Sequence, residues 1–205
     1  AILVLPFEPL LEIPKGVWAI ASHLQSKEEA SAWMESAKSA QAWSFRLPIC
    51  SERVAIEILR SFRRRAPFLG VHGRRDWAAL CGADAIVEGS RSLPSEVASP
   101  LESPHRVFAT HTLDELKKCQ ENHAPSAVFF GPIWETPSKK GILEPRGLGE
   151  LKRACSQEVP VIALGGIQTV EQVQACRDAG VHGVAVLRAA KDEKGLAGLC
   201  AAFTA

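Results

Sequence analysis

The chain has 205 residues, a length that fits one domain or at most two small ones. Its formal net charge is only +1, so it offers no strong field for binding nucleic acid or a membrane surface. No apolar stretch reaches the ~20 residues that span a bilayer, and the apolar start at 1–5 is too short for a signal peptide. The six cysteines form no CxxC pair, which argues against a zinc motif or a disulfide scaffold. We therefore expect a cytoplasmic protein.

Short apolar runs recur along the chain, and segments with helical patterns lie between them. The runs are continuous rather than alternating, which is typical of parallel strands covered on both faces. We expect eight strands, at residues 17–21, 43–47, 68–72, 85–88, 106–109, 127–130, 160–164 and 183–187.

The segments between these runs carry the start and stop signals of helices. An apolar stripe runs through residues 52–66, and Gly180 stands where a helix is expected to end on a left-handed residue. Three pairs have the spacing of a capping box, in which side chains bind free N–H groups of the first turn. The pairs are Ser26 with Glu29, Thr112 with Glu115, and Thr169 with Gln172.

The alternation of strands and helices implies right-handed parallel crossovers. Eight such units in 205 residues predict an α/β fold of the (β/α)8 TIM-barrel type, in a single domain over residues 17–205. The alternative, an open doubly wound sheet, typically needs only five or six strands. Residues 1–16 form a proline-rich extension whose role stays open: an arm, a plug across the barrel bottom, or a contact in a homodimer.

Functional groups in such a barrel gather where the strands end, in the loops that follow them. Gly165 and Gly166 end the run at 160–164 just before a helix, so their main-chain N–H groups can turn toward an anion. Leu187 and Arg188 form the matching turn after the last strand. Phosphate sites after the seventh and eighth strands recur in these barrels, and we predict one here.

Several segments in the second half of the chain carry distinctive motifs: THTLDEL (110–116), FFGPIWETPSKKG (129–141), PRGLGEL (145–151), PVIALGGI (160–167) and AGVHGVAVLRAA (179–190). In this order they resemble the thiamine phosphate synthase/TenI family. Upstream, residues 44–48 and 73–94 follow the family's motifs around its second to fourth strands.

The resemblance implies a role for the hydroxyl-rich loop after the sixth expected strand. In synthases a T-x-T-K loop holds the pyrophosphate of the aminopyrimidine substrate, and this loop corresponds to Thr136, Ser138 and Lys139. Hydroxyl donors and an ammonium group suit an anion of this kind. Arg46 and Arg74, which stand at arginine positions of the family motifs, are assigned to substrate binding on the same basis.

The family's thiazole phosphate site maps onto the glycine turn and the last turn of the barrel. Gly165 and Gly166 correspond to its cradle of main-chain groups, and Leu187 and Arg188 to the start of the final loop. Arg188 replaces the family's usual serine, and a guanidinium can still bind phosphate. The implied ligand is a phosphorylated thiazole.

The chain departs from the synthase pattern at the metal site. Synthases hold Mg²⁺ with two aspartates to stabilise the leaving pyrophosphate, and those positions are Gly73 and Ser92 here. The family's strand-two lysine is replaced by Pro48. We therefore expect no metal ligand and no cofactor, with Mg²⁺ involved only if synthase activity is retained.

The TenI branch, whose characterised members are thiazole tautomerases, also lacks the metal ligands, and its E-T-x-x-K-K-G loop resembles residues 135–141. Its proton transfer needs a base with a pKa near neutral, but the position of the branch's histidine is Pro132 here. His72 and His111, both at strand ends, remain as candidate bases. We predict a TenI-like tautomerase or related enzyme. A synthase and a non-catalytic phosphate binder or regulator stay open.

Overall fold

The computed structural model describes residues 12–46, 48–89, 105–137 and 141–205. Its strands are β1 (Gly16–Ser22), β2 (Ala42–Arg46), β3 (Leu69–His72), β4 (Ala85–Glu88), β5 (His105–Thr110), β6 (Ala127–Phe130), β7 (Val161–Leu164) and β8 (Gly183–Val186). Its helices are α1 (Lys27–Ser36), α2 (Glu52–Arg63), α3 (Arg75–Cys81), α4 (Leu113–His123), α5 (Gly147–Cys155), α6 (Val170–Asp178), the short 3-10 helix η2 (Ala189–Lys191) and α7 (Glu193–Thr204).

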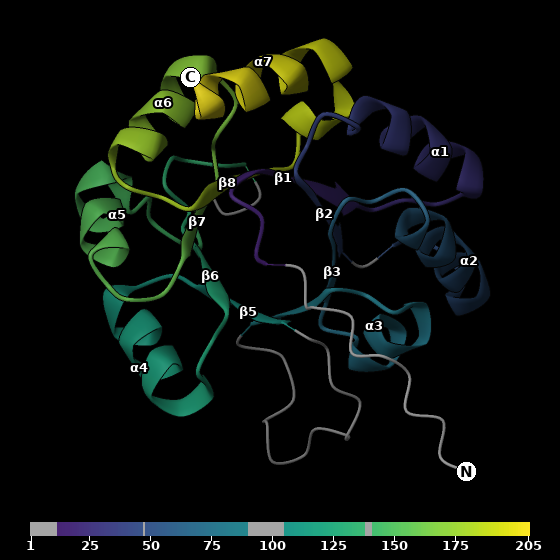
Figure 1. Ribbon diagram of the computed structural model, residues 1–205, viewed down its shortest axis with the longest axis horizontal. Coiled ribbons are helices and arrows are strands. Elements are labelled where there is room, and N and C mark those ends of the chain that lie inside the picture. The colour runs from purple at the N-terminus through teal and green to yellow at the C-terminus, as the bar shows by residue number, and fades with distance from the viewer. Residues whose placement is uncertain (1–11, 47, 90–104, 138–140) are drawn as a thin grey trace.

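The eight strands form one closed parallel barrel. Each strand pairs with the next in sequence order, and β8 pairs with β1 to complete the ring. Figure 1 shows the strands at the centre and the helices arranged around them. The predicted single-domain (β/α)8 barrel is therefore confirmed, and all eight expected strands are present.

Two apolar clusters stabilise the barrel. The larger cluster lies between the strands and the surrounding helices. The smaller cluster fills the interior, where Trp18 packs against Phe68 and Phe129 with ring centroids 5.3 and 5.5 Å apart. These three side chains are almost completely buried. The barrel is thus a packed core rather than an open pore, as its side-chain layers require.

Hydroxyl side chains begin three of the helices where the sequence predicts capping. Ser26, Thr112 and Thr169 each accept a hydrogen bond from the N–H group three residues later. The reciprocal bond of a complete capping box forms only at Thr169, through Gln172. At the other two helices the glutamate accepts from the residue before the cap instead. All three helix starts are fixed by local side-chain contacts.

A buried carboxylate connects three elements on the outer side of the barrel. Glu88, at the end of β4, is 2% exposed. It accepts hydrogen bonds from Arg75 at the start of α3 and from Arg106 on β5, with Arg106 Nε and Nη2 at 3.1 and 3.0 Å. Ionic pairing of this kind makes burial of the charge tolerable.

All six cysteines are free thiols. Burial raises the pKa of the Cys119, Cys155 and Cys200 thiols to about 11, and that of Cys176 to about 12. These thiols therefore stay protonated and unreactive near neutral pH. Across the described residues we find no helix with the length and apolar character needed to cross a membrane.

Candidate functional site

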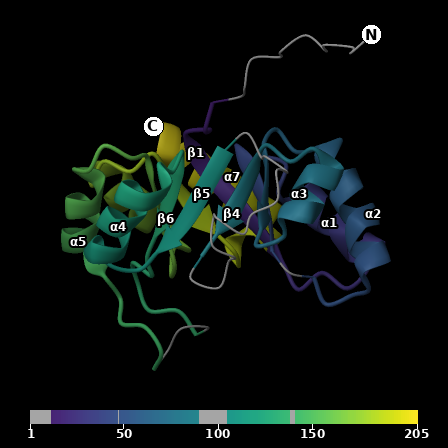
Figure 2. The ribbon, with the colours of Figure 1, turned by 90° about the horizontal axis from the view of Figure 1, so that it is seen from below.

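The loop that follows β6 lies directly on the turn that follows β7. Ile133 N donates to Leu164 O at 3.0 Å, and Trp134 N donates to Gly165 O at 3.1 Å. Figure 2 shows the described parts of this loop projecting from one end of the barrel. The two segments predicted to bind phosphate, separated by some thirty positions in the sequence, are therefore neighbours at the carboxyl ends of the strands.

Glycine is required twice in the β7 turn. Gly165 and Gly166 have φ values of 99° and 75°, in the left-handed region that glycine favours. A Cβ atom on Gly165 would lie 2.7 Å from Pro132 Cα, and one on Gly166 would lie 2.6 Å from Trp134 Cβ. The close approach of the β6 loop thus leaves no room for a side chain at either position.

Main-chain N–H groups without partners gather at the ends of β7 and β8. The N–H groups of Gly165, Gly166, Leu187 and Arg188 donate to no residue of the described chain. All four residues are at least partly exposed. Donors of this kind, held in place by the backbone, suit an anionic ligand.

The predicted binding side chains fall into two groups. Arg46 and Arg188 are exposed at the ends of β2 and β8, and their guanidinium groups pair with no carboxylate of the described chain. Thr136, 7% exposed, lies in the β6 loop. Ser138 and Lys139 lie outside the described residues.

Arg74 is occupied by protein carboxylates. It donates to both oxygens of Asp76, with Nε 2.8 Å from Oδ1, and its Nη1 lies 2.9 Å from Glu52 Oε1. Its guanidinium also lies over the Trp77 ring, 4.1 Å from the centroid. These contacts fix Arg74 on the α2 and α3 side, so in this conformation it is already neutralised and is a weaker candidate for substrate binding than Arg46.

His72 lies in the interior of the barrel. Its Nε2 is hydrogen bonded to Ser44 Oγ at 2.5 Å, and its ring stacks on Phe129 with centroids 6.2 Å apart. Burial, with the nearby positive charge of Arg46, lowers the pKa of His72 to about 3. An imidazole with this pKa is neutral at physiological pH and is a poor proton acceptor, which does not suit the general base predicted for His72.

His111 is held in one orientation at the start of the loop after β5. Its Nδ1 lies 2.5 Å from Gly131 O, and its main-chain N–H donates to Glu115 Oε2 at 2.6 Å. Because a carbonyl oxygen only accepts, Nδ1 carries the proton of the neutral ring and Nε2 bears the lone pair. His111 is thus the better placed of the two predicted bases.

The metal position gives no support for a bound divalent cation. Gly73 follows β3 with a φ of 67° and carries no donor side chain. Within the described ranges, no group of three or more His, Cys, Asp or Glu residues is arranged to hold a metal ion. Ser92 falls in the segment 90–104, which the structure does not describe. The residues present do not fit the Mg²⁺ site of a synthase.

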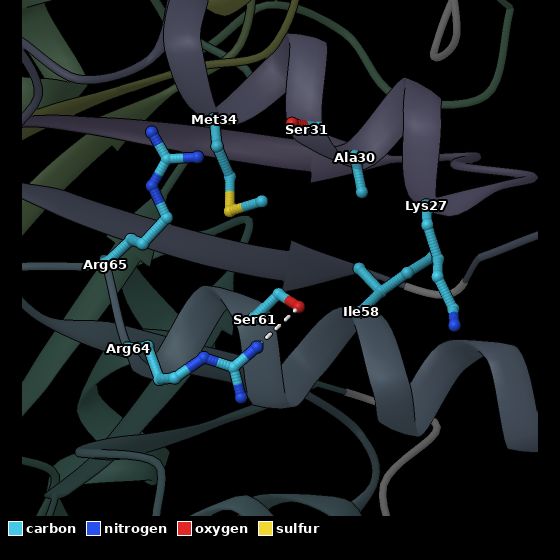
Figure 3. Close-up of a pocket in the computed structure, with 8 residues that line it drawn as sticks. All are labelled: Lys27, Ala30, Ser31, Met34, Ile58, Ser61, Arg64 and Arg65. Carbon is cyan, nitrogen blue, oxygen red and sulfur yellow. Dashed lines mark hydrogen bonds between the residues drawn. The ribbon is translucent and has the colours of Figure 1, made fainter.

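A separate hollow of about 240 Å³ lies between α1 and α2 (Figure 3). Its cations already have partners: Lys27 pairs with Glu57, Arg65 with Glu35, and Arg64 Nη2 donates to Ser61 Oγ at 3.1 Å. The hollow is on the outer helices, away from the strand ends. We therefore assign it no part in the site.

Two contributors to the site are missing from the sequence-based prediction. Ser44 lies two residues before Arg46 on the same face of β2, and that alternation is the signal that it points inward. Arg146 lies at the end of the β6 loop, where its main-chain N–H donates to Pro132 O at 2.8 Å. It belongs to the PRGLGEL segment, and no local pattern marks it.

Comparison with known proteins agrees with this architecture. The model of the thiamine monophosphate synthase family matches residues 50–190. A thiamine-phosphate synthase of Mycobacterium sp. (strain JLS) is 35% identical over 143 residues, covering 67% of this chain and 62% of that protein. One from Chlorobium phaeovibrioides is 29% identical and covers 88% of this chain and 80% of that protein.

A solved structure, thiamine phosphate pyrophosphorylase from Pyrococcus furiosus, superposes with a TM-score of 0.79 at 22% identity, covering 92% of this chain and 95% of that chain. At this identity the likeness shows the fold alone. The chain spans 62–64% of the length of the mycobacterial relatives it matches. On the match to the family model, this chain belongs to the thiamine monophosphate synthase family.

Proposed function

We propose that this barrel binds a phosphorylated thiazole where β7 and β8 end. The observation that carries the proposal is the set of unpaired N–H groups on Gly165, Gly166, Leu187 and Arg188. A phosphate monoester dianion accepts several hydrogen bonds at once, and the exposed Arg188 guanidinium adds a charge that can pair with it. The ligand is a small molecule, and the proposal requires no nucleic acid or membrane.

The first candidate reaction is that of thiamine phosphate synthase. The names of the relatives in Mycobacterium and Chlorobium support it. In this reaction the thiazole nitrogen forms a bond to the methylene carbon of hydroxymethylpyrimidine pyrophosphate, and pyrophosphate leaves with the bonding electrons. Arg46 and Thr136 would bind the pyrimidine substrate. Gly73 supplies no carboxylate for a metal at the position of the synthase ligand.

The second candidate is a TenI-like isomerisation of the thiazole ring, and the geometry of His111 favours it. With Nδ1–H donated to Gly131 O, the Nε2 lone pair is available to accept a proton from the substrate. The same nitrogen returns the proton to another ring position, and the double bond shifts between them. The substrate is an anion and His111 a cation between the two proton transfers, and both regain their original charge when the proton is returned.

Thermal unfolding with and without thiazole phosphate tests the shared binding site. We expect millimolar ligand to raise Tm, because a ligand that binds only the folded state stabilises it. Arg188→Gln, which removes a charge without filling space, should reduce that rise. An unshifted melting curve for the wild type would remove the basis of both candidate reactions.

Activity assays then separate the candidates. Product formation from both thiamine half-substrates with Mg²⁺ would establish the synthase, whereas ring-proton exchange without Mg²⁺ would establish the isomerase. For the isomerase, His111→Gln should lower kcat by about 100-fold or more. His182→Gln is the matched control, because His182 binds Ile13 O next to the amino end of β8. Ligand binding with neither activity would identify a non-catalytic binder.

A further inference from the structure

His23 has an unusual backbone conformation for a residue with a side chain. Its φ is 62°, in the left-handed region that glycine favours. In the described chain the other non-glycine residue with a positive φ is Ala124, which ends α4, where a left-handed residue is common. His23 lies instead in the connection from β1 to α1, at the end of the barrel that carries the proposed phosphate site.

The residues on both sides of His23 hold this conformation in place. Ser22 is the last residue of β1, and Ser26 caps the start of α1. Between them, Leu24 is buried, and its carbonyl oxygen accepts a hydrogen bond from Ile49 N at 3.0 Å. Residues held in sparsely populated conformations are concentrated at binding and catalytic sites, where the rest of the fold compensates for their strain.

The imidazole of His23 lies at the mouth of the barrel, where the strands end. Ile20 of β1 belongs to the interior cluster, and Ser22 follows two residues later on the same inward face. His23 Nδ1 lies 2.9 Å from Ser22 Oγ, so the ring lies beside a hydroxyl that points into the barrel. Because His23 is exposed, its ring is accessible to a molecule bound there.

The turn that follows β8 is the neighbour of His23 on one side. β8 pairs with β1 to close the barrel (Figure 1), and the register places Ala19 opposite Val186. The two chains run in parallel from this pair, so the end of β1 lies beside the turn at 187–189. The helix η2, which follows this turn, packs against both β1 and α1. His23 is thus next to the main-chain donors of the proposed phosphate site.

The contact with Ser22 favours one tautomer of the His23 ring. Ser22 is 8% exposed, and its Oγ has no other partner in the described chain. A buried hydroxyl needs an acceptor for its proton, and Nδ1 of a neutral imidazole can be that acceptor. Nε2 then carries the ring hydrogen, and it has no partner among the described residues. His23 can therefore donate one hydrogen bond to a bound molecule.

We propose that His23 donates its Nε2–H to the phosphate of the ligand and so extends the phosphate site from β7 and β8 to the end of β1. Ser22 is the positioning residue, because its hydroxyl fixes the ring tautomer. A hydrogen bond to a phosphate is stronger than one to a neutral acceptor, because the acceptor is charged. The left-handed backbone of His23 is the conformation that holds the imidazole beside the site. This inference rests on the proposed function.

Calorimetric titration of the whole chain with inorganic phosphate and with thiazole phosphate tests the contact. We expect His23→Gly to weaken the binding of both probes by about tenfold, because it removes the donor. The same variant should raise the Tm of the ligand-free protein by roughly 2–4 °C, because glycine adopts a φ of 62° without strain. Weaker binding by a more stable protein cannot result from misfolding.

Ala124→Gly is the matched control for the change in backbone. Ala124 also has a left-handed conformation, with a φ of 45°, and it lies at the end of α4. Its replacement should raise Tm by a similar amount and change neither affinity by more than about twofold. A comparable loss of affinity in this variant would assign the effect of His23→Gly to the backbone and not to the imidazole.

Ser22→Ala tests the positioning role through a spectroscopic signature. Nitrogen NMR spectra distinguish the two tautomers of a neutral imidazole, and we expect the Nε2–H form for His23 in the wild type. Without the Ser22 hydroxyl the signals should move toward a mixture of both tautomers. The affinity for phosphate should then fall, but by less than in His23→Gly, because part of the population still carries the donor.

Unchanged affinity for thiazole phosphate in His23→Gly would overturn the proposal, as would an Nδ1–H tautomer in the wild type. A loss confined to thiazole phosphate would assign the contact to the heterocycle and would also overturn it. These results are separable from the proposed function. If the wild type binds neither probe, the phosphate site itself fails. If Arg188→Gln weakens binding and His23→Gly does not, that site stands and His23 has no part in it.

Discussion

His72 illustrates how the barrel interior changes the chemistry of a side chain. The residue lies at the end of β3, where a ligand-facing base is expected from the sequence. Burial lowers the pKa of the imidazole, the Arg46 charge lowers it further, and the ring stays neutral. Its role is therefore a neutral hydrogen-bonding group in the floor of the barrel mouth.

The low pKa of His72 predicts an acid-sensitive fold. Between pH 6.5 and about 3 the unfolded chain binds a proton at this residue that the folded state does not. Stability is therefore complete above pH 6.5 and declines as the pH falls toward 3, by up to about 1.4 kcal/mol per pH unit. Urea unfolding of His72→Asn at pH 7 and pH 5 should show a smaller decline than wild type. Equal declines would contradict the assignment.

The backbone conformation of Gly166 and its close contact with the β6 loop predict that a side chain at this position destabilises the fold. Gly166→Ala introduces strain at φ 75° and also a contact at 2.6 Å with Trp134 Cβ. Gly147→Ala is the matched control, because its φ is 68° and a Cβ there meets nothing within 4 Å. We expect Gly147→Ala to lower the free energy of unfolding by about 1 kcal/mol, and Gly166→Ala to lower it by about 1–3 kcal/mol more. Urea titration measures the free energy of unfolding of both variants. Equal losses would show that the β6 loop moves to accommodate the added methyl group at no cost.

Sequence patterns locate individual site residues only in part. Gly165, Gly166 and Arg188 can be proposed from the sequence because glycines and cations at strand ends have a direct chemical meaning. The bond from His111 to Gly131 and the unpaired Nε of Arg146 depend on contacts between distant segments, which no local pattern records. The pKa of His72 likewise depends on the whole interior.

The bounds of strands and helices are predictable from the sequence where the residues of one segment determine them. The strand bounds agree with the apolar runs to within one residue at the ends that the structure describes. Gly180, with φ of 94°, follows α6 as expected. The connection of α3, β4 and β5 through Glu88 is not predictable from the sequence. A carboxylate after an apolar run is equally consistent with a strand end that faces solvent.

The ion pairs of Glu88 with Arg75 and Arg106 predict that Glu88 contributes much more to the free energy of unfolding than the exposed Glu52 does. Glu88→Gln removes the charge that Arg75 and Arg106 share, and leaves both guanidinium groups less compensated. We expect a loss of about 3–5 kcal/mol in the free energy of unfolding. Glu52→Gln is the control, because Glu52 also pairs with an arginine but is 75% exposed. Its loss should be below about 1 kcal/mol, and similar losses in urea titrations would refute the distinction.

For the whole molecule, the closed barrel predicts cooperative unfolding. The interior cluster and the outer cluster share the same eight strands, so neither can be lost while the other stays intact. Tryptophan fluorescence, which reports on all five tryptophans including Trp18 inside the barrel, and far-ultraviolet circular dichroism should give the same urea midpoint. Distinct midpoints would indicate two separately folding parts.

The architecture of the whole molecule is predictable because eight similar units repeat one physical pattern. Each apolar run and each helix contributes independent support for the barrel, so an error in one unit does not change the conclusion. The site lacks this redundancy. Arg74 shows the difference: the motif position is retained, but Asp76 and Glu52 already bind its guanidinium.

The aromatic side chains inside the barrel limit the routes by which a small molecule can enter and leave. Trp18, Phe68 and Phe129 block the axis, so nothing can pass from one end of the barrel to the other. A ligand bound at the strand ends must therefore enter and leave by the same open end of the barrel. A bound product would therefore have to leave before the next substrate could bind.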